Sequence, residues 1–234
     1  MAEQLRELNI RDADILLEPE GRNTAPAVAL AAHLTQERIE DAILVVLPSD
    51  HVIQQAETFL EVLSQAIELA KNDHLVTFGV VPTHAETGYG YIRRGTAQGV
   101  GFVVDEFVEK PDAARAAEFL SAGSYYWNSG MFVFKASVYL SELNRQRPEM
   151  AEACADAVTE LTNDLDFIRV NVNAFRSSPS ESIDYAVMEQ ADNAMVVPLD
   201  AGWSDIGSWD SLWTILDKDG NDNSITGDVI TNDL

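Results

Sequence analysis

Short runs of apolar residues that end at turn-forming residues recur along the chain and predict buried strands. Residues 42–47 form the first strong run, six apolar residues that lead through a proline into Asp50. Residues 75–81 and 194–198 have the same character, and a proline follows or ends each of them. Uninterrupted apolar runs of this length are typical of strands buried on both faces, as in a parallel sheet. We therefore expect residues 42–47 to be a central strand of such a sheet.

The apolar positions of residues 59–70 recur at three- and four-residue steps, which predicts an amphipathic helix between the first two strands. Strand, helix and strand in this order make a βαβ unit, so we expect an α/β fold with a largely parallel sheet. Residues 163–180 are irregular, with short strands around 167–172. Further helices are predicted at 2–8, 27–34, 112–120, 137–145, 148–161, 182–189 and 210–216, and further strands at 14–18, 100–108, 131–134 (after an Asn-Ser-Gly turn) and 225–230.

Composition and charge limit the classes of partner. The chain has 234 residues, 46% of them hydrophobic, which is enough for the core of one α/β domain or two small ones. Its 15 basic and 39 acidic residues give a net charge of −24, which disfavours nucleic acid and anionic membranes as partners. One cysteine, Cys154, excludes an intramolecular disulfide and a cysteine-based zinc site. The sequence contains neither a membrane-spanning stretch nor a signal-peptide pattern, so we expect a cytoplasmic protein.

Two acidic turns follow predicted strands and suggest a metal site. Asp50 comes after residues 42–47, and Asp205 comes shortly after residues 194–198. Ligands of parallel sheets collect beyond the carboxyl ends of the strands, so both carboxylates can reach one edge. Mg²⁺ usually takes one or two carboxylates together with substrate phosphates, and it would let an acidic protein hold an anionic nucleotide. Taken alone, the stretch around Asp50 favours a residue that caps a turn or the following helix.

Several loops could contact a ligand, although each also has a purely structural explanation. Thr24 is a suitable N-cap for the helix after residues 20–26, and a helix amino terminus can bind a polar or anionic group. Gly88 and Gly90 on either side of Tyr89 allow close backbone approach to a ligand. Glu109 and Lys110 end a strand, and Asn128 lies in a polar segment that could orient a hydroxylated ligand or only satisfy a bend.

Other common chemistries lack their motifs. The four histidines are scattered without the spacing of metal ligands, and the sequence has no GxSxG nucleophile elbow. The phosphate-binding loop GxxxxGK[ST] is also missing, and Gly-Tyr-Gly lacks the third glycine of a dinucleotide fingerprint.

Seven segments, in order, resemble bacterial mannose-1-phosphate guanylyltransferase, including the form fused to a mannose-6-phosphate isomerase domain. The resemblance covers essentially the whole chain, and seven ordered motifs are far more specific than any one of them. The segments are Glu-Pro (18–19) with Gly-Arg-Asn-Thr-Ala-Pro-Ala (21–27), Leu-Pro-Ser-Asp-His (47–51), Thr-Gly-Tyr-Gly-Tyr-Ile (87–92), Phe-Val-Glu-Lys-Pro (107–111), Trp-Asn-Ser-Gly-Met-Phe (127–132), Ser-Ile-Asp-Tyr-Ala-Val-Met-Glu (182–189) and Gly-Trp-Ser-Asp-Ile-Gly-Ser-Trp (202–209).

The resemblance implies a nucleotide-diphospho-sugar transferase fold, a Rossmann-like three-layer sandwich with a mixed, mostly parallel sheet. Residues 1–216 would form the nucleotidyltransferase core, and residues 217–234 a linker and the start of a carboxyl-terminal β-rich extension. The family opens with a strand and a glycine-rich loop that cradles the triphosphate, and no segment here matches them. We therefore expect an N-terminally truncated core that lacks its first strand.

The implied reaction joins mannose 1-phosphate to GTP and gives GDP-mannose and pyrophosphate. The resemblance assigns Mg²⁺ to Asp50 and Asp205, and it leaves room for a homodimer. Asp184 is expected to give structural support only. The remaining implied roles are catalysis near the sugar phosphate for Lys110, sugar binding for Gly88, Tyr89, Glu109 and Asn128, and contact with the nucleotide base for Arg22, Asn23, Thr24 and Ala25.

Two alternatives stay open at this point. One is a related sugar-1-phosphate nucleotidyltransferase that uses another sugar or base. The other is a non-catalytic module that binds a sugar nucleotide, and the missing glycine-rich loop favours it.

Overall fold

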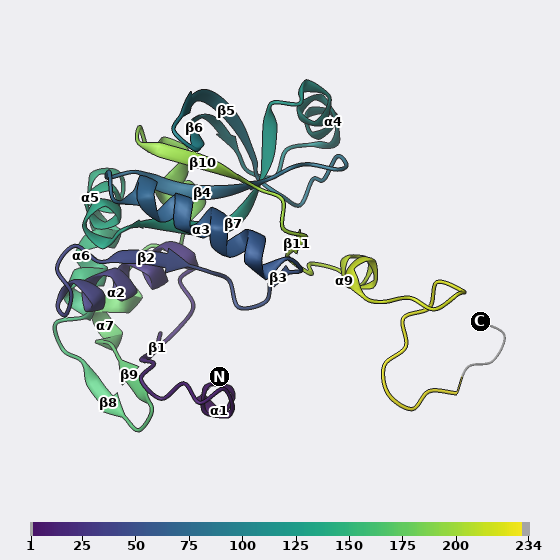
Figure 1. Ribbon diagram of the computed structural model, residues 1–234. Coiled ribbons are helices and arrows are strands. Elements are labelled where there is room, and N and C mark those ends of the chain that lie inside the picture. Colours follow the sequence, from purple (N-terminus) through teal and green to yellow (C-terminus); the bar gives the residue numbers. More distant parts are fainter. Residues whose placement is uncertain (1, 231–234) are drawn as a thin grey trace.

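The computed structural model describes residues 2–230 and is built around a six-stranded mixed sheet (Figure 1). The strand order is β2-β7-β4-β10-β6-β5, and β7 bends so that its first residues also pair with β5. The strands are β2 (Ile43–Val46), β4 (Leu75–Val80), β5 (Tyr91–Gln98), β6 (Gly101–Val108), β7 (Tyr125–Lys135) and β10 (Ala194–Leu199).

β4 lies in the middle of the sheet, and each of its residues is buried. Its neighbours β7 and β10 cover both edges, which explains why the strand is an unbroken apolar run. Gly79 is required there: a Cβ atom at this position would lie 2.6 Å from Val196 Cγ2 and 2.7 Å from Tyr126 Cβ. The register of β4 against β7 shifts next to this glycine, between Thr77 and Gly79.

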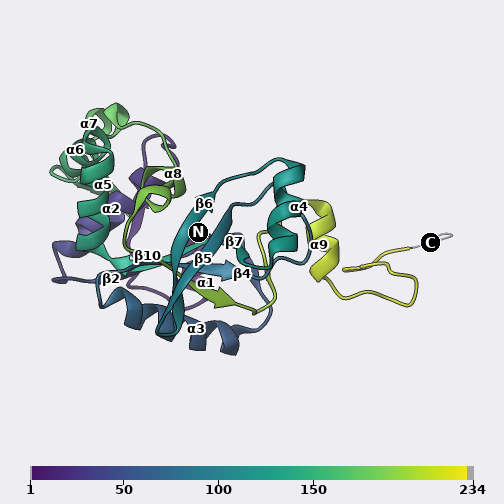
Figure 2. The same cartoon turned by 90° about the horizontal axis from the view of Figure 1, so that it is seen from above.

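Helices cover both faces of the sheet, so the three-layer α/β sandwich is confirmed. Figure 2 shows α3 (Ala56–Ala70) on one side of the strands and the group of α2, α5 and α6 on the other. Alternate residues of β4 serve the two cores: Leu75 packs with the α2 group, whereas Val76 and Phe78 pack with α3. The helices of that group are α2 (Thr24–Gln36), α5 (Ala136–Gln146) and α6 (Pro148–Ala157).

Smaller elements lie around this sandwich. A three-stranded sheet has the order β1-β9-β8, and a two-stranded antiparallel ladder joins β3 to β11. Residues 217–230 contain no helix or strand and extend away from the sheet (Figure 1). The smaller elements are α1 (Ala2–Glu7), β1 (Ile15–Leu17), β3 (Val52–Ile53), α4 (Ala113–Ala122), β8 (Thr162–Asp164), β9 (Phe167–Arg169), α7 (Val172–Ser177), α8 (Ile183–Ala186), β11 (Trp203–Ser204) and α9 (Trp209–Ile215).

The expectation of a central, buried strand at residues 42–47 is wrong. Among the described residues β2 pairs only with β7, so it lies at the sheet edge, and Val45 is 38% exposed. Its apolar residues are explained by packing instead, because Leu44 and Val46 lie against the α2 side of the core and Ile43 against the α3 side.

The sheet is also less parallel than expected. β2 and β4 both run antiparallel to β7, which enters between them from later in the chain, and β4–β10 is the one parallel pair found in this sheet among residues 2–230. The βαβ pattern of segments that follow one another in the sequence could not predict that β7 inserts between β2 and β4.

Four local expectations need correction. The Asn-Ser-Gly segment is no turn but part of β7, where Gly130 takes φ +68°. Residues 91–98 form β5 and residues 172–177 form α7, and neither was expected. The strand expected at residues 225–230 does not form.

Candidate functional site

The β3–β11 ladder brings the two predicted metal ligands together. Val52 pairs with Ser204 and Ile53 with Trp203, in antiparallel register. Asp50 precedes β3 and Asp205 follows β11, so both leave this ladder at the same end. The expectation that these carboxylates lie at one edge is thus met, but by a short antiparallel ladder rather than by two parallel strands.

His51 lies close enough to both carboxylates to be affected by their charges. Burial lowers the pKa of His51, and the charges of Asp50 and Asp205 both oppose that shift. Both aspartates therefore act on the same imidazole. Trp203 Nε1 donates a hydrogen bond of 3.1 Å to His51 Nδ1, which ties the end of the ladder together.

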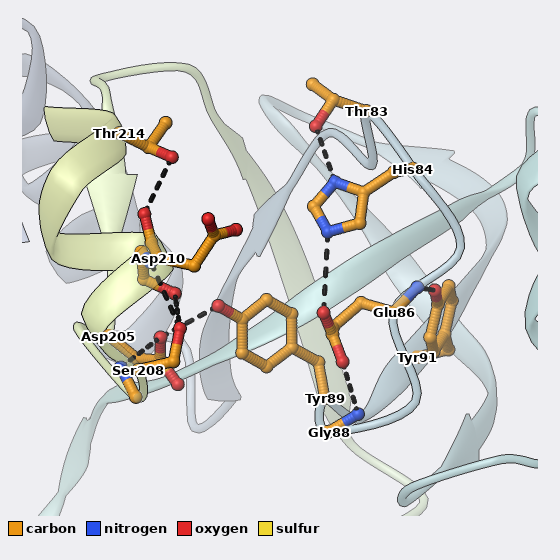
Figure 3. A network of polar contacts seen from close by, with 12 residues as sticks. Thr83, His84, Glu86, Gly88, Tyr89, Tyr91, Asp205, Ser208, Asp210 and Thr214 are labelled. Atoms are coloured by element: carbon orange, nitrogen blue, oxygen red, sulfur yellow. Dashed lines mark hydrogen bonds and ion pairs between the residues drawn. The ribbon is translucent and has the colours of Figure 1, made fainter. Parts of the chain in front are cut away.

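Asp205 is held by one of its two carboxylate oxygens. Tyr89 Oη donates to Asp205 Oδ1 over 2.7 Å, and the Gly207 backbone N–H donates to the same oxygen over 3.1 Å. Figure 3 shows the Tyr89 hydroxyl directed at Asp205, beside the first turn of α9. Within residues 2–230, Asp205 Oδ2 accepts no hydrogen bond, which leaves it available to a ligand. Burial and the neighbouring Asp205 raise the pKa of Tyr89 well above its usual value.

The Tyr89 ring is fixed by two indoles. Its centroid lies 5.2 Å from that of Trp127 and 5.4 Å from that of Trp203, and both pairs are edge-to-face. The Tyr89 carbonyl also accepts a hydrogen bond of 3.2 Å from the Lys110 N–H. Tyr89 therefore connects the aspartate pair to the end of β6.

The loop before β5 has its own internal bonds. Glu86 accepts from the Gly88 N–H over 2.7 Å, its carboxylate lies 3.4 Å from His84 Nε2, and its own N–H donates to Tyr91 Oη over 2.9 Å (Figure 3). Gly88 is exposed, and a Cβ atom there would meet only the Glu86 side chain. The structure thus places Gly88 away from Glu109 and Asn128.

Gly90, to which the family resemblance assigned no sugar-binding role, is the glycine that contacts Glu109 and Asn128. A Cβ atom on Gly90 would be 2.4 Å from Glu109 Oε2 and 3.2 Å from Asn128 Cβ. The Gly90 carbonyl also accepts from the Asn128 N–H over 2.8 Å. The sequence signal was the second glycine of Gly-Tyr-Gly, but spacing alone could not distinguish it from the first.

Glu109 is a buried carboxyl with carboxyl neighbours. Its side chain is 15% exposed, and Lys110 Nζ lies 3.9 Å away from Glu109 Oε1. Burial, followed by the charges of Asp184 and Glu189, raises the pKa of Glu109 to about 7 against the opposing charge of Lys110. Lys110 itself is 65% exposed and takes φ +47°, so its ammonium group faces solvent beside the site.

Asn128 projects from the middle of β7 and is bonded at both ends of its amide. Its Nδ2 donates to Asp184 Oδ1 over 2.7 Å, and its Oδ1 accepts from Thr77 Oγ1 over 3.2 Å. Burial raises the pKa of Asp184, while the hydrogen bonds from Asn128, its own N–H and Ser182 oppose that shift. Asp184 therefore lies in direct contact with a predicted sugar-binding residue.

The four residues predicted to contact the base lie together at the start of α2. Asn23, and not Thr24, is the N-cap: its Oδ1 accepts from the Thr24 N–H over 2.9 Å, at φ +66°. Thr24 is free to bond elsewhere, and its hydroxyl accepts from the Ile183 N–H over 2.9 Å. The Arg22 guanidinium donates to Glu20 and to the Arg176 carbonyl.

Ala25 is fully buried, and both of its backbone polar groups are used inside the protein. Its N–H donates to the Glu181 carbonyl over 3.2 Å, and its carbonyl accepts from Tyr139 Oη over 2.8 Å. This residue can shape the loop, but it has no free group of its own for a ligand.

The site offers a metal two oxygen ligands, the carboxylates of Asp50 and Asp205. No group of three or more His, Cys, Asp or Glu side chains suited to a metal occurs in residues 2–230. A pair of carboxylates with solvent access fits Mg²⁺, which keeps several waters and takes few protein ligands. A cavity of about 580 Å³ lies elsewhere, between α1, β1 and the β8–β9 hairpin.

Comparison with known protein families found a match over most of the chain. A family model described as nucleotidyl transferase matches residues 1–222. The chain belongs to the nucleotidyl transferase family. No helix in the described part of this nucleotidyl transferase is long and apolar enough to cross a membrane.

The curated relatives are about twice as long as the chain. It is 54% identical to the mannose-1-phosphate guanylyltransferase RfbM of Salmonella typhimurium, over 98% of the chain and 48% of that protein. It is 52% identical to the xanthan biosynthesis protein XanB of Xanthomonas campestris, over 98% of the chain and 49% of that protein. The chain thus spans about half the length of the curated relatives it matches.

Two solved structures have the same fold. A Helicobacter pylori structure described as mannose-6-phosphate isomerase is 35% identical with a TM-score of 0.77, over 86% of this chain and 79% of that one. A Thermus thermophilus structure described as mannose-1-phosphate geranyltransferase is 34% identical with a TM-score of 0.79, over 93% of this chain and 62% of that one.

The pKa of Glu109 predicts how stability depends on pH. Because the folded pKa is about 7 and the ordinary value 4.5, ionisation of Glu109 opposes folding. The stabilising effect of the protonated carboxyl is complete below pH 4.5 and is lost as the pH rises to about 7. Glu109→Gln should therefore raise the free energy of unfolding by roughly 1–3 kcal/mol at pH 8, measured by urea denaturation.

The matched control is Glu118→Gln, at an exposed position of α4. Its unfolding free energy should follow the wild-type pH profile. A Glu109→Gln protein that also parallels the wild type from pH 5 to 8 would contradict the assignment of Glu109 as a buried, proton-binding carboxyl.

Proposed function

We propose that this nucleotidyl transferase binds mannose 1-phosphate and GTP and takes part in their conversion to GDP-mannose and pyrophosphate. The observation that carries the proposal is the continuous set of contacts from Asp205 through Tyr89 to Gly90, Glu109 and Asn128. The relatives named mannose-1-phosphate guanylyltransferase, at 49–54% identity, supply the choice of sugar and base. The reaction, its substrates and its pathway are all part of this proposal.

The carboxyl-rich end of the site suits a sugar. Glu109 and Asn128 offer acceptors and a donor to hydroxyl groups, and the absence of a side chain at Gly90 lets both residues lie directly against this loop. The same carboxyls repel phosphate, so the phosphate of the sugar should lie toward Lys110, which adjoins Glu109 and faces solvent. This arrangement distinguishes the two ends of mannose 1-phosphate by charge.

We assign Mg²⁺ to Asp50 and Asp205. When bound there, the ion offsets the negative charge of the phosphoryl oxygens. The chain's own residues position the reactants: Tyr89 holds Asp205 by Oδ1 so that Oδ2 stays free, and Lys110 orients the sugar phosphate. An oxygen of that phosphate attacks the α-phosphorus of GTP, the new P–O bond forms, and the α–β bridging bond breaks to release pyrophosphate. No covalent enzyme intermediate is required.

The loop of Arg22, Asn23 and Thr24 is proposed to lie against the nucleotide base. Its backbone is fixed by the Asn23 cap and by the bond from Thr24 to α8, so it presents a preformed edge. GDP-mannose is a donor for polysaccharide assembly, in keeping with the name of the Xanthomonas relative. A cytoplasmic location and a homodimer stay predictions.

The direct experiment is an assay of pyrophosphate release with GTP, UTP, dTTP and ATP, each combined with several sugar 1-phosphates, alongside calorimetric titration of GDP-mannose. We expect GTP with mannose 1-phosphate to be preferred, and GDP-mannose to bind more tightly with Mg²⁺. Preference for another pair would indicate a related nucleotidyltransferase. Tight binding of GDP-mannose without any turnover would indicate a sugar-nucleotide binder and overturn the catalytic part of the proposal.

Removal of either carboxylate charge should abolish the effect of Mg²⁺. Asp50→Asn and Asp205→Asn should each remove the Mg²⁺-dependent gain in GDP-mannose affinity, because a neutral amide is a poor ligand for a hard cation. Both proteins should keep the wild-type circular dichroism spectrum. If both variants retained full Mg²⁺ dependence in calorimetry, the metal assignment would be wrong.

A pair of glycine variants tests where the sugar binds. Gly90→Ala should weaken mannose 1-phosphate binding at least about tenfold, since its methyl group must displace Glu109. Gly88→Ala, two residues away in the same loop, meets only the flexible Glu86 side chain and should bind within about twofold of wild type. Equal affinities for the two variants in calorimetry would contradict this placement of the sugar.

A further inference from the structure

The short helix α8 links the two predicted subsites. On one side it is tied to the start of α2, where the Ile183 N–H donates to Thr24 Oγ1 over 2.9 Å and the Ala25 N–H donates to the Glu181 carbonyl over 3.2 Å. On the other side Asp184 Oδ1 accepts from Asn128 Nδ2 over 2.7 Å. The loop assigned to the base and the strand assigned to the sugar are therefore connected through this helix.

The Asn128 amide needs a hydrogen-bond partner that fixes its orientation. A primary amide has nearly the same shape after a half-turn about its last bond, so only hydrogen bonds decide which end is the donor. Two groups reach the Oδ1 end, but both contacts are long: the single hydroxyl proton of Thr77 is shared between Asn128 Oδ1 and the Met131 carbonyl, each at 3.2 Å, and the Gly130 N–H donates to Asn128 Oδ1 over 3.3 Å. A carboxylate accepts hydrogen bonds but cannot donate them, so Asp184 can bond only to the NH₂ end of the Asn128 amide.

Structural support alone is a poor explanation for a carboxylate at this position. Burial of a charged group costs free energy, and an apolar side chain would fill the space without that cost. What the carboxylate adds is a short, charge-assisted hydrogen bond of 2.7 Å that fixes the NH₂ end of the amide, whereas Thr77 and Gly130 reach the Oδ1 end over 3.2 and 3.3 Å. The second Nδ2 hydrogen of Asn128 takes part in no hydrogen bond within residues 2–230, which leaves it for a ligand.

We propose that Asp184 is a positioning residue that locks the Asn128 amide with its NH₂ group toward α8, so that the second Nδ2 hydrogen is presented to a sugar hydroxyl. The assignment rests on the proposed function for the identity of the ligand, but the orientation of the amide is a property of the chain itself. Substitution of Asp184 should therefore act on the sugar end of the site through Asn128, without direct contact between Asp184 and the ligand.

The first test reads the amide without any ligand. Asn128→Ala identifies the side-chain NH₂ resonances of Asn128 in ¹⁵N–¹H spectra. Asp184→Ala should shift them upfield, because the charge-assisted hydrogen bond is lost. Asp184→Asn keeps the shape and an acceptor oxygen, so it should fold like the wild type and shift the same resonances by a smaller amount. Unchanged Asn128 resonances in both variants would overturn the proposal.

The second test measures the affinity for mannose 1-phosphate by calorimetry. Asp184→Ala should weaken binding about tenfold and Asp184→Asn no more than about threefold, because the amide retains an acceptor. The double variant Asn128→Ala/Asp184→Ala should bind no more weakly than Asn128→Ala alone, since Asp184 acts through Asn128. Additive losses would show that Asp184 acts on its own and would contradict the positioning role.

A distant carboxylate provides the control for lost polar contacts. Asp41, at the opposite end of β2 from Asp50, accepts from the Ser137 hydroxyl and pairs with Lys135. Asp41→Ala should lower stability but leave both the Asn128 resonances and the affinity unchanged. If the wild-type chain did not bind mannose 1-phosphate at all, the proposed function would fail, whereas the resonance shifts would still decide the positioning role.

Discussion

The hydrogen bond from Tyr89 Oη to Asp205 joins the two halves of the candidate site. One half is the β3–β11 ladder, which carries Asp50, His51 and Asp205. The other half is the start of β5 and the end of β6, where Gly90 and Glu109 lie. Tyr89 reaches both because its hydroxyl bonds the ladder while its carbonyl accepts from Lys110. Since two indoles fix the Tyr89 ring, the relative placement of the halves is set by packing before any ligand binds.

The charge distribution gives each half a different task. The chain carries a net charge of −24, and its site is built largely from carboxyls. Anionic phosphates can approach such a surface only where a cation lies, which favours a divalent ion at the aspartate pair and Lys110 at the sugar phosphate. Glu109, Asp184 and Asn128 instead form a neutral-to-acidic wall that suits hydroxyl groups, and the raised pKa of Glu109 reflects its burial and, after that, the charges of nearby carboxyls.

Sequence reasoning predicted the α/β class, most helices and the buried strand at β4, because these depend on local periodicity. It could not predict that β7 inserts antiparallel between β2 and β4, since that pairing joins segments that lie far apart in the chain. For the same reason residues 42–47 were taken for a central strand when they form an edge. The exposed Val45 shows that an apolar run by itself does not fix a strand's place in the sheet.

At the site, acidic residues at strand ends were enough to select Asp50 and Asp205, whereas the roles of Glu109 and Asn128 came from the family resemblance. The structure brings the first two together at the β3–β11 ladder and the other two together around Gly90. The choice between Gly88 and Gly90 needed coordinates, because only the Cβ clash with Glu109 distinguishes them. The contact of Asp184 with Asn128 was also invisible in the sequence, where the two residues lie 56 positions apart. Long-range side-chain partners of this kind are what single-sequence patterns omit.

The most direct test of the account is a crystal structure of the chain with GDP-mannose and Mn²⁺, whose anomalous signal locates the metal independently of the fitted coordinates. The account predicts an anomalous peak within coordinating distance of both Asp50 and Asp205, with mannose hydroxyls on Glu109 and Asn128. A peak at any other site, or a mannose ring bound away from Gly90, would contradict it.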